Sequence, residues 1–513
     1  MKIAAAKTVR RLEAQAQETL KIAEKSLMEK ASELCAWHIH SFKQAHDALR
    51  GLPTVIFAGK GNNGGDGILT GGYLSSKYHE QITIYSLQTP AEMSDEIRRH
   101  FFALPKDVKV VFINDKNLQI DLHTPSLIID AILGIGFKGE LRGTAKKLIN
   151  LINSSNNPVV SIDVPSGIET DSGDGQEAVF ADLTLTIGAQ KRGLYVSDGR
   201  IHSGRVEFLD IGFDIAQIPD SEVEFEVISD VMPKLFPRRR EEFYKTRNGK
   251  LLIIGGSESY PGAVVLSTLG ANGAGCGLLS AAIKKRPYSS FLPSVIVRDF
   301  SSSGGNCFNQ SDIPELKKLA MMQDCVVFGM GVTVGSEIAG VLKMLLQNCD
   351  RLLLDADALN TLALFPELWQ FKKHKNIVLT PHHQEAVRLA EAFKIAGFEA
   401  MERTQQAAVL AEKLQCTVVL KGEKTLIASV DLPMFVNPVG SCALAKGGSG
   451  DILSGIIGAL LAREKNMSCH ELAACGVWLH AAAADFAAQS RTAFDINDLP
   501  QALKKYIDSI TLF

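Results

Sequence analysis

The chain has 513 residues, more than one hydrophobic core usually accommodates, so its length predicts two or three domains. Its hydrophobic content of 46%, charged content of 22% and net charge of −3 are those of a globular protein without a nucleic acid or an anionic membrane as partner. The chain does not begin with a secretory apolar segment, no apolar run is long enough to span a membrane, and its nine cysteines include no CxxC pair. We therefore expect a cytoplasmic protein with reduced thiols.

The first fifty residues predict one or two helices. The segment Thr8–Leu49 is polar and rich in alanine, and its apolar residues recur every three or four positions. The residues that define this spacing are Leu20, Ala23, Leu27, Ala31 and Leu34.

Short apolar runs then alternate with amphipathic stretches, which is typical of an α/β domain. The runs that predict strands are Thr54–Ala58, Ile82–Leu87, Lys109–Ile113, Leu127–Ala131, Val159–Val164 and Leu183–Ile187. One of the amphipathic stretches, Leu141–Ile152, predicts a helix. Because the runs are apolar throughout, we expect a parallel sheet covered on both faces, in a Rossmann-like three-layer domain over residues 1–214.

A domain boundary is expected near residues 214–247. Asp214–Val227 is acidic and has no apolar period, and Pro233–Arg247 contains three consecutive arginines, which we interpret as a solvated linker or domain edge. A second alternation predicts an α/β domain over residues 225–513. Its strands are predicted at Lys250–Ile254, Val295–Val297, Cys325–Gly329, Arg351–Asp355, Asn376–Thr380 and Thr417–Leu420.

The first predicted strand leads into the glycine-rich segment GKGNNGGDG at residues 59–67. We interpret this segment as a loop in which glycine lets backbone N–H groups approach a phosphate or another polar ligand. The side chains of Asn62, Asn63 and Asp66 add polar groups to it. Its spacing is not GxGxxG, so the usual dinucleotide fingerprint does not apply.

Two further strand ends carry polar residues. The segment LIIDAILGIGFKG places Asp130 before a second glycine-rich turn with Lys138, and SIDVPSG places Asp163 and Ser166 at the next strand end. Ligands of parallel sheets bind beyond the carboxyl ends of the strands, so these groups and Asn63 predict an oxygen-rich pocket for a hard cation or a polyhydroxy ligand. Each aspartate alone could equally be a helix cap or a turn former, and the coincidence of three strand ends favours function.

These motifs resemble the NAD(P)H-hydrate epimerase family over the predicted first domain. The resemblance includes KRGL at Lys191–Leu194 and LME at Leu27–Glu29, although Lys30 and Ser32 stand where the family has Asn and Gly. It implies that a hydrated nicotinamide dinucleotide contacts Asn62, Asn63, Gly64, Gly65, Asp66, Gly134, Ile135, Gly136, Phe137, Lys138, Gly139 and Glu140. It also implies a potassium ion (K+) on Asn63, Asp130 and Ser166, and an acid/base role at the reacting ring carbon for Asp163, with Lys138 nearby.

A second glycine-rich segment, KGGSGD at Lys446–Asp451, opens an apolar helix. The helix places Ile452, Leu453, Ile456, Ile457, Leu460 and Leu461 on one stripe. Backbone N–H groups of Gly448, Ser449 and Gly450 could stabilise a transferring phosphoryl group while Asp451 accepts a proton from a substrate hydroxyl. There is no Walker motif in this half, and the arrangement resembles ribokinase-like folds, whose GxGD motif does this work. Plain packing of a glycine-rich helix start is the alternative for this motif taken alone.

Five neighbouring motifs make the second resemblance specific. They are KLLIIGGSESYPGAVVLSTLGANGAG from Lys250, FGMGV from Phe328, LDADALN from Leu354, TPHHQEA from Thr380 and LKGEKT from Leu420. Together they resemble the ADP- or ATP-dependent NAD(P)H-hydrate dehydratase family over roughly residues 225–505, which implies a C-terminal ribokinase-like domain.

This resemblance implies two groups of contacts. The hydrated nucleotide would touch Ala263, Gly331, His382 and Asp451. The phosphate donor, ADP or ATP with Mg²⁺, would bind Lys421, Gly422, Glu423, Lys424, Thr425, Ser441, Lys446, Gly447, Gly448, Ser449 and Gly450. The sequence departs from the family at His383 and Gln384, where Pro-Gly is usual, and at Lys446, where Thr or Ser is usual.

The favoured interpretation is a bifunctional repair enzyme that epimerises hydrated NADH and NADPH (NADHX and NADPHX) and then dehydrates the S epimer with ADP or ATP. We expect it to form a homo-oligomer. Two alternatives stay open. The second half could be a vitamin-precursor kinase, which would release a stable phosphorylated product, and the first half could be a non-catalytic binding module.

Overall fold

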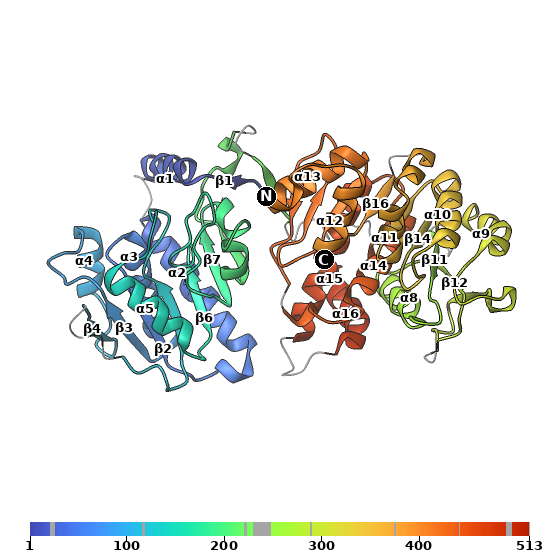
Figure 1. Ribbon diagram of the computed structural model, residues 1–513. Coiled ribbons are helices and arrows are strands. Elements are labelled where there is room, and N and C mark those ends of the chain that lie inside the picture. Colours follow the sequence, from blue (N-terminus) through green and yellow to red (C-terminus); the bar gives the residue numbers. More distant parts are fainter. Residues whose placement is uncertain are drawn as a thin grey trace. The chain divides into compact units, whose positions relative to one another are not determined.

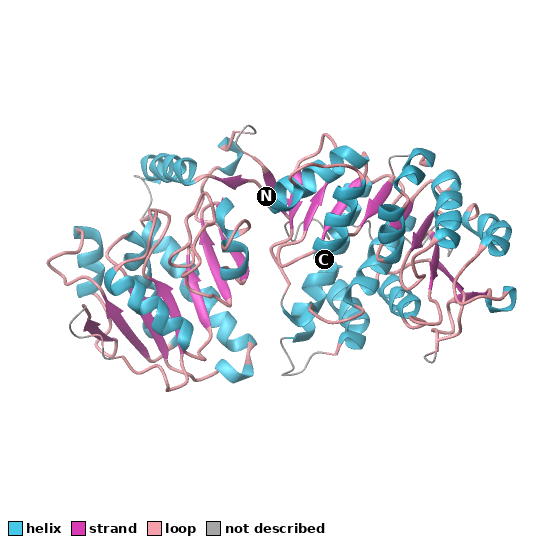
Figure 2. Ribbon diagram, viewed as in Figure 1, coloured by secondary structure: helices cyan, strands magenta, loops and turns pink. Residues whose placement is uncertain are grey.

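The computed structural model describes residues 1–20, 26–114, 118, 120–219, 223–228, 248–287, 290–373, 376–440, 442–488 and 495–511. The chain forms two compact units, Met1–Val227 and Ile228–Phe513. Each contains parallel strands accompanied by helices, so the predicted α/β class is confirmed (Figure 1 and Figure 2). The described helices include none that is long and apolar enough to cross a membrane. The linker expected at Pro233–Arg247 lies outside the described residues.

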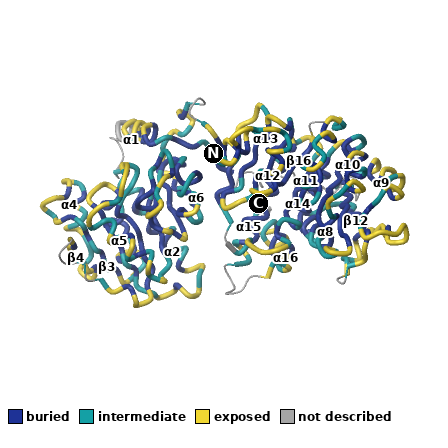
Figure 3. Tube along the Cα trace, viewed as in Figure 1, coloured by how far each residue is buried: buried dark blue, intermediate teal, exposed yellow. Residues whose placement is uncertain are grey.

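The N-terminal unit is built on a seven-stranded sheet in which all neighbouring strands are parallel. Its strand order is β4 (Lys109–Phe112), β3 (Ile82–Ser86), β2 (Thr54–Ala58), β5 (Leu127–Ala131), β6 (Val159–Ile162), β7 (Leu183–Ile187) and β9 (Arg205–Leu209). Apolar residues of α2 (Leu27–Ala45), α3 (Asn62–Tyr78) and α4 (Asp95–Phe102) pack on one face, and those of α5 (Gly143–Ser154) pack on the other. The predicted three-layer arrangement is therefore confirmed. Figure 3 shows buried residues concentrated on the sheets and on the sides of the helices that cover them.

The first residues of the chain belong to this unit as well. β1 (Ile3–Ala4) pairs in parallel with β8 (Gln190–Lys191), and α1 (Ala6–Leu20) follows β1. With α2, this helix confirms the expectation of one or two helices near the start. The sequence did not predict β1, β8, β9 or β10 (Phe225–Val227), because strands of two or three residues carry no periodicity and β9 lies at the edge of its sheet. The strand β10 corrects the interpretation of Asp214–Val227 as wholly irregular.

The glycine-rich segment after β2 is mostly helix rather than loop, which corrects its interpretation. Helix α3 begins at Asn62, directly after the cap residue Gly61. A Cβ added to Gly59 would lie 1.7 Å from the carbonyl oxygen of Ile132, and one on Gly67 would lie 2.6 Å from the Cβ of Ala131. These glycines therefore let the chain turn tightly and let α3 approach the neighbouring strand β5, in addition to any contact with a ligand.

The C-terminal unit has a larger sheet. Its strands follow in the order β19 (Met434–Val436), β18 (Leu426–Ala428), β17 (Thr417–Leu420), β16 (Ile377–Leu379), β15 (Leu352–Leu354), β14 (Cys325–Phe328), β11 (Lys250–Gly255), β12 (Leu278–Ile283) and β13 (Ile296–Asp299). The strands from β17 to β13 are parallel, whereas β18 and β19 are antiparallel additions. The sequence missed β12, whose serine and alanines weaken the strand pattern, and the short strands β18 and β19.

Helices surround this sheet (Figure 2). They are α8 (Ala263–Gly273), α9 (Ile313–Ala320), α10 (Ser336–Asn348), α11 (Asp357–Leu364), α12 (His383–Ala392), α13 (Arg403–Leu414), α14 (Ser449–Arg463), α15 (Cys469–Ala488) and α16 (Leu499–Thr511). Apolar residues of α8, α14, α15 and α16 join those of the strands in one core.

Helix α14 is buried on nearly all of its circumference, because it packs against α8, α15 and β14. The six apolar residues predicted to form a stripe are all buried, but so are Ser454, Gly455, Gly458 and Ala462 on its other sides. The prediction of a single apolar stripe was therefore too narrow. The glycines permit close helix packing: a Cβ on Gly455 would lie 1.9 Å from the carbonyl oxygen of Ser267 in α8.

This contact yields a stability prediction. Gly455→Ala should lower the free energy of unfolding of the C-terminal unit by about 1–3 kcal/mol or more, because α8 and α14 must move apart to admit the methyl group. Gly447→Ala is the matched control, since a Cβ there would meet nothing within 4 Å. Calorimetric unfolding of both variants tests this expectation. Equal unfolding of the two would mean that the helices do not pack as closely as described.

Candidate active sites

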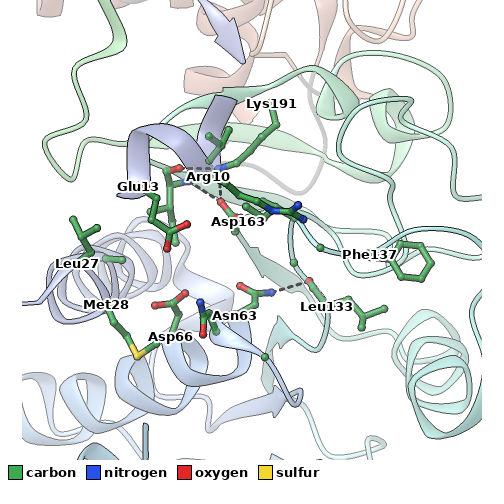
Figure 4. A pocket seen from close by; sticks show the side chains of 18 of the residues that line it. Arg10, Glu13, Leu27, Met28, Asn63, Asp66, Leu133, Phe137, Asp163 and Lys191 are labelled. Carbon is green, nitrogen blue, oxygen red and sulfur yellow. Dashed lines mark hydrogen bonds and ion pairs between the residues drawn. The ribbon is translucent and has the colours of Figure 1, made fainter. Parts of the chain in front are cut away.

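A pocket of about 1190 Å³ opens at the carboxyl ends of β2, β5 and β6 in the N-terminal unit (Figure 4). Three predicted groups of contacts line it: Asn62, Asn63 and Asp66 on α3, residues 134–138 after β5, and Asp163 after β6. The structure thus brings together groups that lie up to a hundred residues apart. The other predicted contacts do not line it. Gly64 and Gly65 are buried in the first turn of α3, and Gly139 and Glu140 lie on the surface just beyond the pocket.

Asp163 has a left-handed backbone conformation, and an ion pair with Lys191 holds its carboxylate. Its φ angle is +69°, which side chains other than glycine, asparagine and aspartate rarely adopt. Its carboxylate Oδ1 accepts hydrogen bonds from the Lys191 ammonium and, at 3.1 Å, from the backbone N–H of Ile187. The Lys191 ammonium also donates to the Ile187 carbonyl at 2.7 Å and is almost completely buried. These bonds fix the carboxylate and leave its Oδ2 available to a ligand.

The ion pair shows what sequence reasoning missed. Lys191 appeared there only as the first residue of the KRGL motif, with no role of its own. Its neighbours in the sequence are Gln190 and Arg192, so nothing local indicated that its side chain is buried against an acidic partner. The lysine that was singled out, Lys138, lines the pocket but is two-thirds exposed, and its nearest acidic partner is Glu169 at 3.9 Å.

The three predicted metal ligands form one buried polar cluster. The Asp130 carboxylate accepts hydrogen bonds from the Ser166 hydroxyl at 2.5 Å, the Ser166 backbone N–H at 2.8 Å and the Ser161 hydroxyl at 2.8 Å. The Asn63 amide donates to the Leu133 carbonyl at 2.8 Å, and the Leu133 backbone N–H donates to the Ser166 hydroxyl at 2.8 Å. Burial raises the pKa of Asp130, and its hydrogen bonds oppose that rise.

The Asn63 side chain carries the clearest sign of a missing ligand. Its Oδ1 atom is buried and has no hydrogen-bond partner among the described residues. An unsatisfied buried acceptor is costly, so it indicates a donor or a cation at this position. The described residues contain no cluster of three His, Cys, Asp or Glu side chains suited to a metal ion. A site built from neutral oxygens and one carboxylate fits a monovalent cation better than a divalent one.

Two more carboxyls face the pocket. Burial raises the pKa of Asp66 well above its ordinary value, and the nearby carboxylates of Asp163 and Glu13 add to the rise. Burial and the charge of Asp163 likewise raise the pKa of Glu13. Sequence reasoning did not single out Glu13 or its neighbour Arg10, because α1 carries no motif and lies about fifty residues before the first glycine-rich segment.

A second group of ionisable residues lies at the carboxyl ends of the parallel strands in the C-terminal unit. The Lys421 ammonium after β17 donates to Asp355 Oδ1 after β15 at 2.8 Å and lies 3.9 Å from Glu385 on α12. The Ser454 hydroxyl of α14 donates to the other Asp355 oxygen at 2.5 Å. Lys421 and Asp355 therefore form a fixed pair, and Asp355 is the member that sequence reasoning left unassigned although it lies in the LDADALN motif.

Asp451 lies in the first turn of α14, as predicted. Burial and, after it, the charges of Asp355 and Asp357 raise its pKa to about 7, and the charge of Lys421 opposes them. A carboxyl poised near neutral pH is suited to general acid/base work. The neighbouring Gly450 is close to the ion pair, since a Cβ there would lie 3.5 Å from the Lys421 ammonium nitrogen.

The remaining predicted substrate contacts lie after successive elements of the same unit. Gly331, which follows β14, has a φ of +64°, and a Cβ there would lie 3.3 Å from the Cβ of Ala263 at the start of α8. His382 caps α12: its Nδ1 accepts hydrogen bonds from the backbone N–H groups of Gln384 at 3.1 Å and Glu385 at 3.3 Å. Its Nε2, on a half-exposed ring, lies 3.5 Å from the Glu385 carboxylate.

The predicted phosphate-donor residues fall into two segments. In the first, Arg403 donates to the carbonyl of Lys421 at 3.1 Å and lies 3.8 Å from Glu423, so it braces the LKGEKT turn. Lys424 in that turn is buried, which lowers its pKa to about 8, and donates to the Pro438 carbonyl at 3.3 Å. In the second segment Lys446 is exposed, and Ser441 lies outside the described residues.

The chain has two α/β domains, and each gathers ionisable side chains at the carboxyl ends of its parallel strands. Ligands of such sheets bind at this edge, so the arrangement is typical of an enzyme. Residues 251–509 match the family model described as NAD(P)H-hydrate dehydratase, and residues 24–193 match that of the YjeF-related protein N-terminus. The chain is 32% identical to the bifunctional NAD(P)H-hydrate repair enzyme of Moorella thermoacetica, over 85% of this chain and 83% of that protein. It is 29% identical to that of Thermofilum pendens, over 98% and 96%. The chain belongs to the family of bifunctional NAD(P)H-hydrate repair enzymes.

Solved structures resemble the C-terminal part. A ribokinase-like superfamily protein from Enterococcus faecalis is 25% identical, with a TM-score of 0.47 over 56% of this chain and 96% of that one. An ADP/ATP-dependent NAD(P)H-hydrate dehydratase from Bacillus subtilis, co-crystallised with ATP and Mg²⁺, is 24% identical, with a TM-score of 0.43 over 56% and 99%.

The environment of Asp451 predicts a pH-dependent stability. An acid with a raised pKa binds its proton more tightly in the folded chain, so this carboxyl favours folding fully below its unfolded pKa of about 4 and progressively less as pH rises to about 7. Asp451→Asn should therefore unfold at a higher temperature than the wild type at pH 8, and the difference should shrink towards pH 5. Melting curves at both values measure it. A difference that does not change with pH would place the Asp451 pKa in its ordinary range.

Proposed function

We propose that the chain repairs hydrated NADH and NADPH with two active sites. The domain of residues 1–214 interconverts the R and S hydrates, and the domain of residues 225–513 uses ADP or ATP to dehydrate the S hydrate. The observation that supports this most is that each unit holds its own lysine–carboxylate pair and a further carboxyl of raised pKa at the carboxyl edge of its sheet. Membership of the repair family agrees with it.

In the epimerase site, Asp163 is the acid/base residue. The Lys191 ammonium and the Ile187 backbone N–H orient it through Oδ1, so Oδ2 can exchange a proton with the hydroxyl on the reacting ring carbon. Asp66, whose raised pKa favours the protonated form, is suited to donate a proton from elsewhere in the pocket. The amides of Asn62 and Asn63 and the backbone of residues 134–138 would hold the dinucleotide.

Potassium fits the polar cluster beside this site. Asn63 would contribute its unsatisfied Oδ1, and Asp130 and Ser166 would contribute the carboxylate and hydroxyl that already lie together. When bound, the ion would supply a positive charge beside the polar groups of the substrate.

In the dehydratase site, Asp451 accepts the proton of the substrate hydroxyl as that oxygen takes a phosphoryl group from the donor. The backbone N–H groups at the start of α14 face the transferring phosphoryl, and Lys421 adds positive charge. Phosphorylation turns a poor leaving group into a good one, so loss of phosphate, with loss of a proton from the neighbouring ring carbon, restores the ring double bond. Both oxygens of Asp355 are occupied, so Mg²⁺ would be held chiefly by the phosphates of the nucleotide.

The alternative of a vitamin-precursor kinase fused to a binding module makes a different product. Incubation of the protein with mixed hydrate epimers, with and without ADP, separates the two. Repair restores the absorbance of the reduced nicotinamide ring, whereas a kinase would accumulate a stable phosphorylated compound. Restored absorbance from both epimers supports two activities, and restoration from the S epimer alone would leave the N-terminal unit without an epimerase role.

Asp451→Asn should abolish nucleotide-dependent dehydration while epimerisation continues. Removal of a general base costs roughly a hundredfold or more in rate. Recovery of absorbance from the purified S epimer measures it, and chromatographic interconversion of the epimers without ADP is the internal control. Near-normal dehydration by the variant would mean that another residue is the base.

Asp163→Asn should have the converse effect. Asparagine keeps the shape of the side chain and tolerates the positive φ, so the substitution removes the charge with little backbone strain. Epimer interconversion should fall by roughly a hundredfold or more, with dehydration of the S epimer intact. If the R epimer disappeared at the normal rate with ADP present, Asp163 would have no acid/base role.

Potassium should stabilise the protein through the Asn63 cluster. Melting temperature and epimerase rate should be higher in potassium than in tetramethylammonium at equal ionic strength, and Asn63→Ala should remove the difference. The variant separates this site from any ion effect on the C-terminal unit. Identical values in both salts for the wild type would argue against the ion.

A further inference from the structure

Helix α1 is fixed at the rim of the N-terminal pocket by contacts that are independent of any ligand. β1 pairs with β8 so that Ala4 lies opposite Lys191, the lysine that holds Asp163. The backbone N–H of Ala6, at the start of α1, donates to the Asp171 carboxylate at 2.6 Å. The first helix of the chain therefore begins beside the catalytic ion pair.

Burial of the apolar side chains of α1 fixes how the helix is rotated, and this sets which of its other side chains face the pocket. Val9 and Leu12 are buried in a small core with Ala189 and Ile218. Arg10 and Glu13 lie three residues apart, on neighbouring positions of the helix surface, and both line the pocket. One helix thus presents a cation and a carboxyl to the same space.

The Arg10 guanidinium has no hydrogen-bond or ion-pair partner among the described residues. It extends towards the GIGFKG segment, where a Cβ on Gly136 would lie 3.9 Å from its Nη2. The other cations of the pocket have partners: Lys191 holds Asp163, Lys60 lies 3.5 Å from Glu92, and Lys138 lies 3.9 Å from Glu169.

Three carboxyls gather on the side of the pocket that contains Asp163. Figure 4 shows the Glu13 carboxyl between Asp163 and Asp66. Burial and the charge of Asp163 raise the pKa of Glu13, which Lys191 and Arg10 oppose, and burial with the charges of Asp163 and Glu13 raises that of Asp66. A diphosphate would be repelled there, whereas a ring hydroxyl that exchanges protons would be accommodated. The charges of the pocket are therefore unevenly distributed, with the carboxyls gathered at the reacting end.

We propose that Arg10 is the residue that binds the diphosphate of the hydrated dinucleotide and so orients its ring towards Asp163. The inference rests on the proposed epimerase function. A guanidinium can form two parallel hydrogen bonds with phosphate oxygens, which gives orientation as well as affinity. Backbone N–H groups of the neighbouring glycine-rich segment would share the same anion.

The test compares Arg10→Met with Arg11→Met in the full chain, without ADP so that only epimerisation proceeds. Arg11 is the adjacent residue and is exposed, as Arg10 is, but it donates to the Gln217 carbonyl at 3.3 Å and does not line the pocket. Arg10→Met should raise the KM for hydrated NADH about 10- to 100-fold with kcat changed little, and Arg11→Met should leave both near wild type. Arg10→Lys should recover only part of the affinity.

A second substrate distinguishes a role of Arg10 in substrate binding from a role in the folded structure. Hydrated reduced nicotinamide riboside has the same ring and no phosphate, so Arg10→Met and wild type should convert it with equal kcat/KM. Equal losses on both substrates would make Arg10 a structural residue, and an unchanged KM for hydrated NADH would mean that it does not touch the diphosphate. Either result overturns the proposal while the epimerase function stands. A wild type that does not interconvert the epimers would overturn both.

Discussion

Parallel pairing of strands is the constraint from which both sites follow. When neighbouring strands run in the same direction, their carboxyl ends meet at one edge, where the sheet's hydrogen bonding stops and polar backbone must find other partners. In the N-terminal unit, β2, β5 and β6 end side by side, and this brings Asn63, Asp130 and Asp163 into one region. In the C-terminal unit, the same rule gathers Asp355, Glu385 and Lys421.

Both units offset the free-energy cost of burying a carboxylate by placing a lysine beside it. Asp163 is paired with Lys191, and Asp355 with Lys421, so that the carboxylate of each site has an opposite charge beside it. Burial, together with the charge of the paired carboxylate, raises the pKa of a second carboxyl nearby, which is Asp66 in one unit and Asp451 in the other. The acid/base roles proposed for these carboxyls thus rest on one arrangement of charges that the chain forms twice.

The sequence predicted what depends on local pattern. Strands such as Thr54–Ala58 and Leu127–Ala131 are continuous apolar runs, and their bounds agree with β2 and β5. It could not reveal that most of GKGNNGGDG is helical, because glycine is a poor helix former and only the close approach to β5 explains its presence. Lys191 and Asp355 lie within recognised motifs, but the sequence does not reveal their partners. An ion pair between residues 28 or 66 positions apart leaves no periodic signal.

Helix α1 shows how far a site can extend beyond its motifs. Its residues are placed by a two-residue strand, a single aspartate cap and two apolar side chains, none of which is visible as a pattern. Because β1 pairs at the register of Lys191, any shift of the first residues would move Arg10 and Glu13 together with the backbone that supports Lys191. The charge of the pocket is therefore coupled to the start of the chain through hydrogen bonds. If Arg10 binds the diphosphate as proposed, the contacts that fix α1 also set which end of the substrate faces Asp163.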